Sequence, residues 1–355
     1  MHVLHILSSQ QAPSCAYYVY VNFEQISADW LRLVRGKRSQ RGFSKRLGYA
    51  SNIAYRWETG VCYPLGREAL ALAKRDGAAG QAALTAFIGS ALPPALCDVD
   101  LGTRAGVAQL LRTLRGKTSL VELARRSGYS RFSIARWLSG AAEPRLPELL
   151  AMVEAATFRL LDFLACFVNI ERLPSVAEEY RALEAARKTA YDVPWSHAVL
   201  RALELSDYRA LGRHQPGWLA KRLGISREEE ELCLTALATA RQIKLERRLW
   251  VVDQTKTIDT RAHPERGRRL KAEWLKVALE RLESGVSGIF SYNLMAISRA
   301  DLARLREMHV AYFRSMQALV ADSTPSECVV LFNAELFALD EPALSVRVTS
   351  PSALA

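Results

Sequence analysis

The sequence LRLVRGKRSQRGFSKRLGYASNIAYRWETGVCYP, Leu31 to Pro64, is the most informative part of the chain because a similar sequence follows it. Eighty positions later, LRTLRGKTSLVELARRSGYSRFSIARWLSGAAEP, Leu111 to Pro144, aligns with it without a gap. Thirteen of the 34 positions are identical, and the identical residues include glycines, a serine and a tryptophan at matching places. Such identity at one fixed offset indicates two copies of one structural unit.

Each copy carries the signals of two short helices joined by a tight turn. Ser39 and Ser119 can cap the first helix, because a serine oxygen accepts from the free backbone N–H groups at a helix start. Gly48 and Gly128 then allow the positive φ that ends a helix. We therefore expect a first helix between serine and glycine in each copy.

The second helix of each copy should begin about two residues after that glycine and stop at the next one. Ser130 is a suitable cap for it in the second copy. Ala54 with Trp57, and Ile134 with Trp137, are three residues apart and share a face that should pack on the first helix. The opposite face of this second helix is then free to meet a partner.

Both copies resemble the lambda-repressor-like, Cro-type helix-turn-helix family. The pattern consists of a small N-cap, a helix ending in glycine, a three-residue turn and a second helix closing with Trp-Glu-x-Gly, here Trp57 to Gly60 followed by a proline. The resemblance covers residues 29–90 and 104–170. It implies a protein that binds double-stranded DNA and inserts the second helix of each copy into the major groove.

In the first copy, the resemblance implies one phosphate contact and a set of base contacts. Gln40, which opens the first helix, would touch a phosphate. Ser51, Asn52 and Tyr55 would face base edges, and Arg56 would reach the DNA backbone or a base.

In the second copy, Arg131 and Phe132 take the base-facing positions, and Arg136 matches Arg56. Arg131 could bind guanine and Phe132 could touch a thymine methyl group. Leucines stand where Gln40 and the glutamate of the Trp-Glu-x-Gly pattern stand in the first copy, at Leu120 and Leu138. The second copy can therefore be either a DNA reader or a dimerisation or spacer unit.

The net charge of +11 is distributed unevenly along the chain. Residues 31–75 carry +9 and residues 104–145 carry +7, so the rest of the chain carries −5. Basic segments of this kind favour a polyanionic partner. We expect phosphate neutralisation from the cations just before or at the helix starts: Lys37, Arg38, Lys117, Arg112 and Arg115.

Residues 191–283 resemble a winged helix, with helices in SHAVLRALEL, GWLAKRLGI and REEEELCLTALATA and a strand pair in LERRLWVVDQ. Ser226 is the expected cap of the third helix. That helix begins with four carboxylates, Glu228 to Glu231, which DNA phosphates would repel. We therefore expect this fold to serve a structural or protein-contact role.

Residues 284–340 have the pattern of a small β-α-β unit. GIFSYNLMAIS (288–298) and ECVVLFNAELFAL (327–339) alternate as strands, and residues 299–322 read as a long helix. Two strands leave open edges, which should pack on the winged helix or pair with a second copy of the chain. The expected assembly is a homodimer through the C-terminal half.

Residues 190–340 together resemble the C-terminal domain of a family of uncharacterised bacterial helix-turn-helix proteins. In that domain a winged-helix-like stretch precedes a strand, a helix and a strand ending in a Phe-containing turn, here Leu336 to Leu339. The resemblance implies a bacterial regulator and identifies no ligand, so any small-molecule or peptide effector stays open.

The expected fold is mainly α, with two tandem helix-turn-helix domains, then a winged-helix-like domain and a small β-α-β unit. The first 28 residues, which include AYYVYVNF, are left as an arm or an extra strand. The expected order is an N-terminal arm (1–28), helix-turn-helix domain 1 (29–90), a linker (91–103), helix-turn-helix domain 2 (104–170), a connector (171–190), the winged-helix-like domain (191–283), the β-α-β unit (284–340) and a tail (341–355).

Other classes of function have little support in the sequence. The chain has no P-loop, dinucleotide loop, metal-ligand spacing or nucleophile elbow, so we expect no enzyme, cofactor or metal. The six cysteines are widely spaced and read as buried thiols. The sequence has neither a long apolar run nor a signal peptide, which predicts a cytoplasmic protein without a membrane partner.

The leading hypothesis is a sequence-specific transcription regulator, either a repressor or an activator. The alternative is an assembly protein whose helix-turn-helix units bind protein partners. Charge favours the first, because protein contacts would not require the basic residues to concentrate in the two repeats.

Overall fold

The structure, a computed structural model, describes residues 22–74, 84, 87–88, 100–116, 118–253, 263–321 and 323–340. The chain is mainly helical, and the sheet in these residues is one antiparallel hairpin. The described residues fall into two compact units, which we call the N-terminal unit, up to Lys271, and the C-terminal unit, from Ala272.

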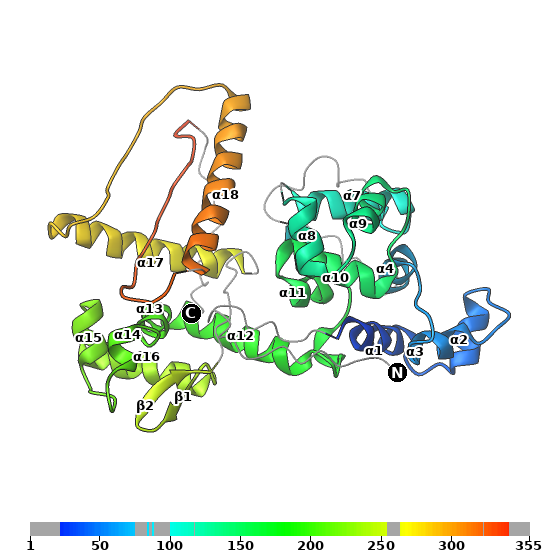
Figure 1. Ribbon diagram of the computed structural model, residues 1–355, viewed down its shortest axis with the longest axis horizontal. Coiled ribbons are helices and arrows are strands. Elements are labelled where there is room, and N and C mark those ends of the chain that lie inside the picture. The colour runs from blue at the N-terminus through cyan, green and yellow to red at the C-terminus, as the bar shows by residue number, and fades with distance from the viewer. Residues whose placement is uncertain are drawn as a thin grey trace, which may run out of the picture. The chain divides into compact units, whose positions relative to one another are not determined.

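The sequence repeat extends in the structure to a set of four helices that occurs twice (Figure 1). The second set follows the first about 80 residues later. We call the two sets the first and the second repeat unit. The first contains α1 (Phe23–Arg35), α2 (Gln40–Arg46), α3 (Ile53–Glu58) and α4 (Gly66–Lys74), and the second contains α7 (Arg104–Arg115), α8 (Leu120–Ser127), α9 (Arg131–Ser139) and α10 (Leu146–Thr157).

The caps predicted for α2 and α8 are confirmed. The Ser39 side chain accepts from the N–H of Gly42, and the Ser119 side chain accepts from the N–H of Glu122. The glycines that end these helices have positive φ, +85° at Gly48 and +76° at Gly128.

The next helix starts at different positions in the two repeat units. In the second, Ser130 caps α9 as predicted, and its side chain accepts from the N–H of Ser133. In the first, Ala50 takes the place of Ser130 and has no oxygen to offer. Asn52 caps α3 instead. The helix was expected to begin about two residues after Gly48, which is wrong for this repeat unit, and Ser51 lies in the turn before α3.

The same aromatic pair packs in both repeat units. Tyr49 meets Trp57 edge-on with ring centroids 5.7 Å apart, and Tyr129 meets Trp137 edge-on at 5.2 Å. Such pairs add to the stability that burial gives. The four residues predicted to face inward are all buried: Ala54, Trp57, Ile134 and Trp137.

The N-terminal arm predicted for residues 1–28 is wrong over its last part. Helix α1 begins at Phe23 and buries Ile26 and Ala28. Asn22 caps this helix, because its side chain accepts from the N–H of Gln25. Residues 1–21 and most of the predicted linker lie outside the described residues, and Thr103 caps α7.

The predicted connector is part of the packed structure. After α11 (Leu160–Ala165) and the short 3-10 helix η1 (Ile170–Arg172), α12 runs from Ala177 to Asp192. Pro174 and Pro194 bracket it. Its Arg187 is buried and pairs with Asp162 at 2.8 Å. A connector without a core of its own would not bury a guanidinium in this way.

The three helices and the strand pair predicted within residues 191–283 are confirmed. Helices α13, α15 and α16 pack on one another, and β1 pairs antiparallel with β2. Ser226 caps α16 as expected. Helix α14 was not predicted. The elements are α13 (Trp195–Ala202), α14 (Ser206–Arg209), α15 (Trp218–Leu223), α16 (Arg227–Thr239), β1 (Ile243–Glu246) and β2 (Leu249–Val252).

The helix predicted over residues 299–322 is confirmed as α18 (Arg299–Ala321), and α17 (Pro264–Glu283) precedes it. The two strands of the predicted β-α-β unit are wrong. Residues 288–298 and 327–339 form no strand, and Figure 1 draws both as stretches without arrows. Alternating apolar residues favour an extended backbone, but a strand also needs a partner for its ladder. Neither segment pairs with the other.

The expectation of buried thiols holds for only some of the cysteines. Cys166 and Cys233 are buried, Cys62 is half-buried and Cys328 is exposed, so for Cys328 the prediction is wrong. Cys15 and Cys97 lie outside the described residues. Over the described residues, no helix has the length and apolarity to cross a bilayer, and no cluster of three or more potential ligands could hold a metal ion.

Candidate nucleic-acid interface

The first repeat unit carries a band of exposed cations on α2, on the turn before it and on α3. The turn holds Lys37 and Arg38, and α2 and α3 hold the others. None of these side chains pairs with a carboxylate among the described residues. We call the following residues the first basic band: Lys37, Arg38, Arg41, Lys45, Arg46 and Arg56.

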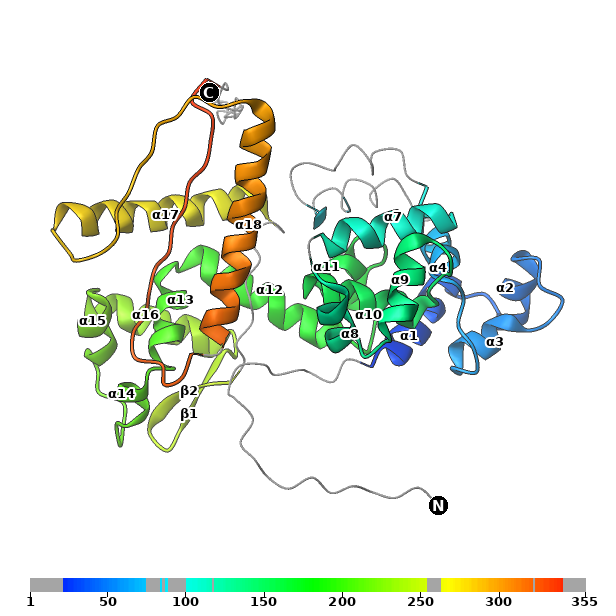
Figure 2. The same cartoon turned by 45° about the horizontal axis from the view of Figure 1, so that its top comes forward.

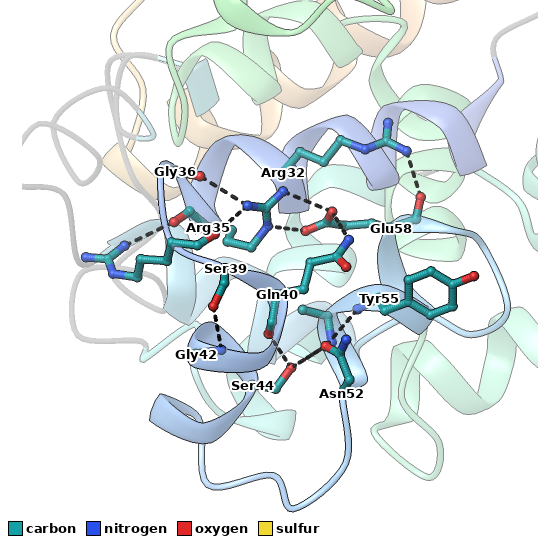
Figure 3. A network of polar contacts seen from close by, with 12 residues as sticks. Arg32, Arg35, Gly36, Ser39, Gln40, Gly42, Ser44, Asn52, Tyr55 and Glu58 are labelled. Carbon is teal, nitrogen blue, oxygen red and sulfur yellow. Dashed lines mark hydrogen bonds and ion pairs between the residues drawn. The ribbon is translucent and has the colours of Figure 1, made fainter.

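One buried carboxylate holds the helices of this band together (Figure 3). Glu58, at the end of α3, is 5% exposed. Arg35 Nε lies 2.5 Å from Glu58 Oε1, and Gln40 Nε2 donates to Glu58 Oε2 at 2.8 Å. The hydrogen bond to Glu58 raises the pKa of Arg35. Gln40, predicted to touch a phosphate, is thus half-buried with its amide already bound.

A second arginine fixes the end of the same helix in both repeat units. Arg32 Nη2 donates to the Glu58 carbonyl at 2.8 Å, and Arg112 Nη1 donates to the Leu138 carbonyl at 2.6 Å. Arg115 Nε donates to the Thr118 carbonyl. The arginine at this position, Arg32 in the first repeat unit and Arg112 in the second, therefore has the same structural role in both. Arg112 and Arg115, which were expected to neutralise phosphates, lie on α7 and have partners inside the chain.

The residues predicted to face bases in the first repeat unit differ in exposure and in their hydrogen bonds within the chain. Asn52 Oδ1 accepts from Ser44 Oγ at 3.3 Å and from the Tyr55 N–H, so it serves as a cap. Tyr55 is 52% exposed. Its ring projects away from Arg35, Gln40 and Glu58, which we call the Glu58 cluster (Figure 3). Ser51 and Arg56 are exposed. Tyr55 and Arg56 are the free side chains of α3.

The second repeat unit has a smaller basic face with an apolar centre. Phe132 is 70% exposed, and the Arg136 guanidinium lies over its ring, 5.6 Å from the centroid. Arg131 is exposed beside them. The cation on the ring orders both side chains on the outer face of α9. Lys117, predicted near a phosphate, lies outside the described residues.

Two further cations of the second repeat unit are neutralised within α8. Arg125 Nη2 and Arg126 Nε each lie 2.6 Å from Glu122 Oε1. The hydrogen bond from Arg125 is the largest of the contacts that lower the pKa of Glu122 to about 2. Gly42 occupies the position of Glu122 in the first repeat unit, so α2 keeps its cations unpaired.

The structure brings only part of the predicted site together on the packed pairs α2–α3 and α8–α9. Gln40 lies on α2, Tyr55 and Arg56 lie on α3, and Arg131, Phe132 and Arg136 lie on α9. The other described site residues lie in the turns before α2 and α3 or on α7. Sequence reasoning missed three cations of the first basic band: Arg41, Lys45 and Arg46. Arg41 and Lys45 are four residues apart on α2, a spacing that places both on one helix face and could have revealed them. It also missed that Glu58 organises the site.

The acidic start of α16 differs from the prediction at one carboxylate. Glu230 is buried and accepts from the backbone N–H groups of Gly217 at 3.0 Å and Ala220 at 2.7 Å. Glu228 and Glu231 are exposed, as expected of a face that would repel phosphates. The expectation that all four carboxylates face outward is therefore wrong for Glu230, which joins α15 to α16.

The comparisons with known proteins bear on the second half of the chain. Residues 177–339 match the family model of a domain of unknown function, DUF4423. The match begins at the first residue of α12 and includes neither repeat unit. No curated protein matches the chain, and no solved structure does.

Proposed function

We propose that this protein is a cytoplasmic transcription regulator that binds specific sites on double-stranded DNA. In this proposal α2–α3 and α8–α9 are helix-turn-helix units, and α3 and α9 enter the major groove. The observation that carries it is the concentration of positive charge in the repeat units, +9 and +7 in the two segments against −5 elsewhere. A fold used only for packing has no reason to confine charge in this way.

The first basic band supports a phosphate contact. Its cations are exposed and unpaired, so their charge is available to replace the counterions that DNA holds. Tyr55 and Arg56 stand beside them on α3, where an arginine can bind guanine bidentately. Glu58 and Arg32 fix α3 to α1, so the positions of Tyr55 and Arg56 on α3 are held relative to the rest of the repeat unit.

The second repeat unit is a reader of a different kind in this proposal. Phe132 would contact a thymine methyl group, and Arg131 and Arg136 would bind phosphate or guanine. The exposure of Phe132 also favours a second candidate function, contact with an apolar protein partner, for this unit alone. If Phe132→Ala leaves DNA binding unchanged, the second candidate holds for α9.

The test of the proposal compares two exposed arginines. Duplexes are enriched from a random pool with the wild-type chain, and Arg56→Ala and Arg268→Ala are titrated against them. Arg268 is exposed on α17, outside both repeats. Loss of one base contact should weaken specific binding by about 5- to 150-fold for Arg56→Ala, and Arg268→Ala should bind like wild type. Equal affinity of all three proteins would contradict the proposal.

Asn52 is unsuitable for this test because it caps α3. Its replacement by alanine would weaken the helix as well as any base contact, typically by about 1 kcal/mol. Tyr55→Ala is the better second variant, since the Tyr55 ring lies outside the Glu58 cluster. Circular dichroism of each variant checks that the helices are intact.

The remainder of the chain supplies assembly in this proposal. Helices α13, α15 and α16 with the β1–β2 hairpin are a winged-helix-like domain with a structural role. The C-terminal unit exposes apolar side chains in its extended segments, Ile289 by 98% and Tyr292 by 91%, and we propose that they contact a second copy of the chain. Ile289→Asp and Tyr292→Asp should then convert a dimer to a monomer in sedimentation equilibrium, whereas unchanged mass would contradict this contact.

A further inference from the structure

Two hydrogen bonds join the repeat units in a reciprocal way. The Gly66 N–H donates to the Pro144 carbonyl at 2.8 Å, and the Leu146 N–H donates to the Pro64 carbonyl at 3.0 Å. Pro64 and Pro144 are equivalent positions of the repeat, and so are Gly66 and Leu146. Exchanging the two units therefore converts each bond into the other. This is the pattern of an isologous interface, in which the same patch of both units meets itself.

The helices at this interface are arranged reciprocally as well (Figures 1 and 2). Helix α4 packs on α10, the equivalent helix of the second repeat unit. Helix α1 packs on α10, and α7 packs on α4, so each first helix contacts the fourth helix of the other unit. Two copies related by simple translation along the chain would make unlike contacts on their two sides.

The contact is close and largely apolar. A Cβ added to Gly66 would lie 2.9 Å from Leu149 Cδ2 and 3.3 Å from the Pro144 carbonyl oxygen, so only glycine fits without a shift. Leu146 and Leu149 are fully buried. An ion pair, Arg67 Nη1 to Glu143 Oε2 at 2.6 Å, crosses the rim. These contacts hold the two units in one fixed arrangement.

The outer faces of α3 and α9 are similar in one position and different in others. Arg56 and Arg136 are identical at equivalent positions. Asn52 corresponds to Phe132, and Tyr55 corresponds to Ala135. Two readers with these side chains would share one contact and differ in the rest.

We infer that a single chain binds one DNA site made of two half-sites in inverted orientation and of unequal sequence. The inference rests on the proposed function. The reciprocal contacts relate the two repeat units by an approximate two-fold axis, in which α3 packed on α1 corresponds to α9 packed on α7. The internal packing differs in one respect, because α8 packs on α10 and α2 does not pack comparably on α4. A DNA duplex offers matching two-fold axes between inverted half-sites. Each chain thus contains within itself the arrangement that a symmetric dimer builds from two chains, and its two unlike readers select two unlike half-sites.

The test uses the full chain and duplexes enriched from a random pool at 0.15 M salt. Each enriched site is compared with a version in which one half-site is reversed, giving a direct repeat, and with a version lengthened by about half a helical turn between the half-sites. The inference predicts that each change weakens binding at least about 10-fold, because only one reader can then engage.

Two variants assign the half-sites. Arg56→Ala should lose discrimination in one half-site and Arg136→Ala in the other. If Arg136→Ala binds like wild type and the enriched sites are symmetric, two chains each use only the first repeat unit, and the inference is overturned. Enriched sites with one half-site, or in direct orientation, overturn it as well. If no sequence is enriched, the proposed function itself fails, which is a different result.

Discussion

Leu65 and Arg145 face each other across an isolated antiparallel bridge, and they occupy the same position in the two copies of the repeat. Equivalent residues of two tandem repeats rarely contact each other, because each unit usually contacts its neighbours through unlike faces. The bridge makes the two repeat units a symmetric pair within one chain. The free energy of unfolding of the chain should therefore depend on the residues that let the two repeat units approach closely.

Gly66→Ala should destabilise the protein by about 1–3 kcal/mol, because the new methyl group would enter the space of Leu149. Alanine at an unstrained glycine in a helix has the opposite effect. Gly212→Ala is the control for the loss of a glycine without a clash, since Gly212 lies in a bend and a Cβ there meets nothing within 4 Å. Urea unfolding followed by circular dichroism measures both variants. A Gly66→Ala protein as stable as wild type would mean that the interface is looser than described.

The Glu58 cluster predicts strong coupling between Arg35 and Glu58. Glu58→Leu copies the residue of the second repeat unit and leaves Arg35 without its carboxylate, which should cost about 1–3 kcal/mol because Arg35 is only partly buried. Arg35→Met combined with Glu58→Leu should cost less than the sum of the single changes. A double-mutant cycle from urea unfolding measures this difference. Additive losses would refute the coupling.

His197 on α13 predicts a loss of stability in mild acid. Burial, and then the nearby Arg201, lower its pKa to about 4, against the smaller opposing effect of Glu204. Between pH 6.5 and 4 the unfolded chain binds a proton that the folded chain does not, so stability is complete above pH 6.5 and falls as pH decreases toward 4. The loss from this group is at most about 3 kcal/mol.

The check is urea unfolding at pH 7 and pH 4.5 of wild type and His197→Gln. Other titrating groups contribute equally to both proteins, so the difference between the two pH dependences isolates His197. We expect the variant to lose less stability than wild type on acidification. Identical losses would show that His197 is protonated as easily in the folded chain as in the unfolded one.

The exposed and the buried cysteines should differ clearly in their rates of alkylation. Burial raises the pKa of Cys166 and of Cys233 to about 12, so little thiolate forms at pH 8. Cys328 is exposed. Alkylation with iodoacetamide, followed by peptide mass spectrometry, should modify Cys328 at least about 10-fold faster than either buried thiol. Comparable rates at all three sites would contradict the burial of Cys166 and Cys233.

Features that depend on a few neighbouring residues could be predicted from the sequence. Ser39, Ser119 and Ser130 cap helices as expected, since a cap needs only its own side chain and the next N–H groups. The same local rule explains the one shifted start. Ala50 removes the oxygen at that position, and Asn52 supplies one two residues later.

Features that depend on distant partners could not be predicted. The extended segments 288–298 and 327–339 have the alternation of strands, but a ladder requires a second strand that the pattern does not identify. The inward turn of Glu230 depends on the N–H groups of Gly217 and Ala220, more than nine residues away. The reciprocal bridge between the repeat units could not be predicted either, because it depends on how the two units pack on each other.

Titration of one enriched duplex with and without excess random competitor, at about 50 mM and 200 mM salt, tests the claim that this protein recognises a DNA sequence. We predict a complex that survives competitor and weakens by at least about 10³-fold between the two salt concentrations, as expected when six or more phosphates are contacted. A complex that disappears with competitor at both concentrations would contradict the claim, because it would leave only a basic surface.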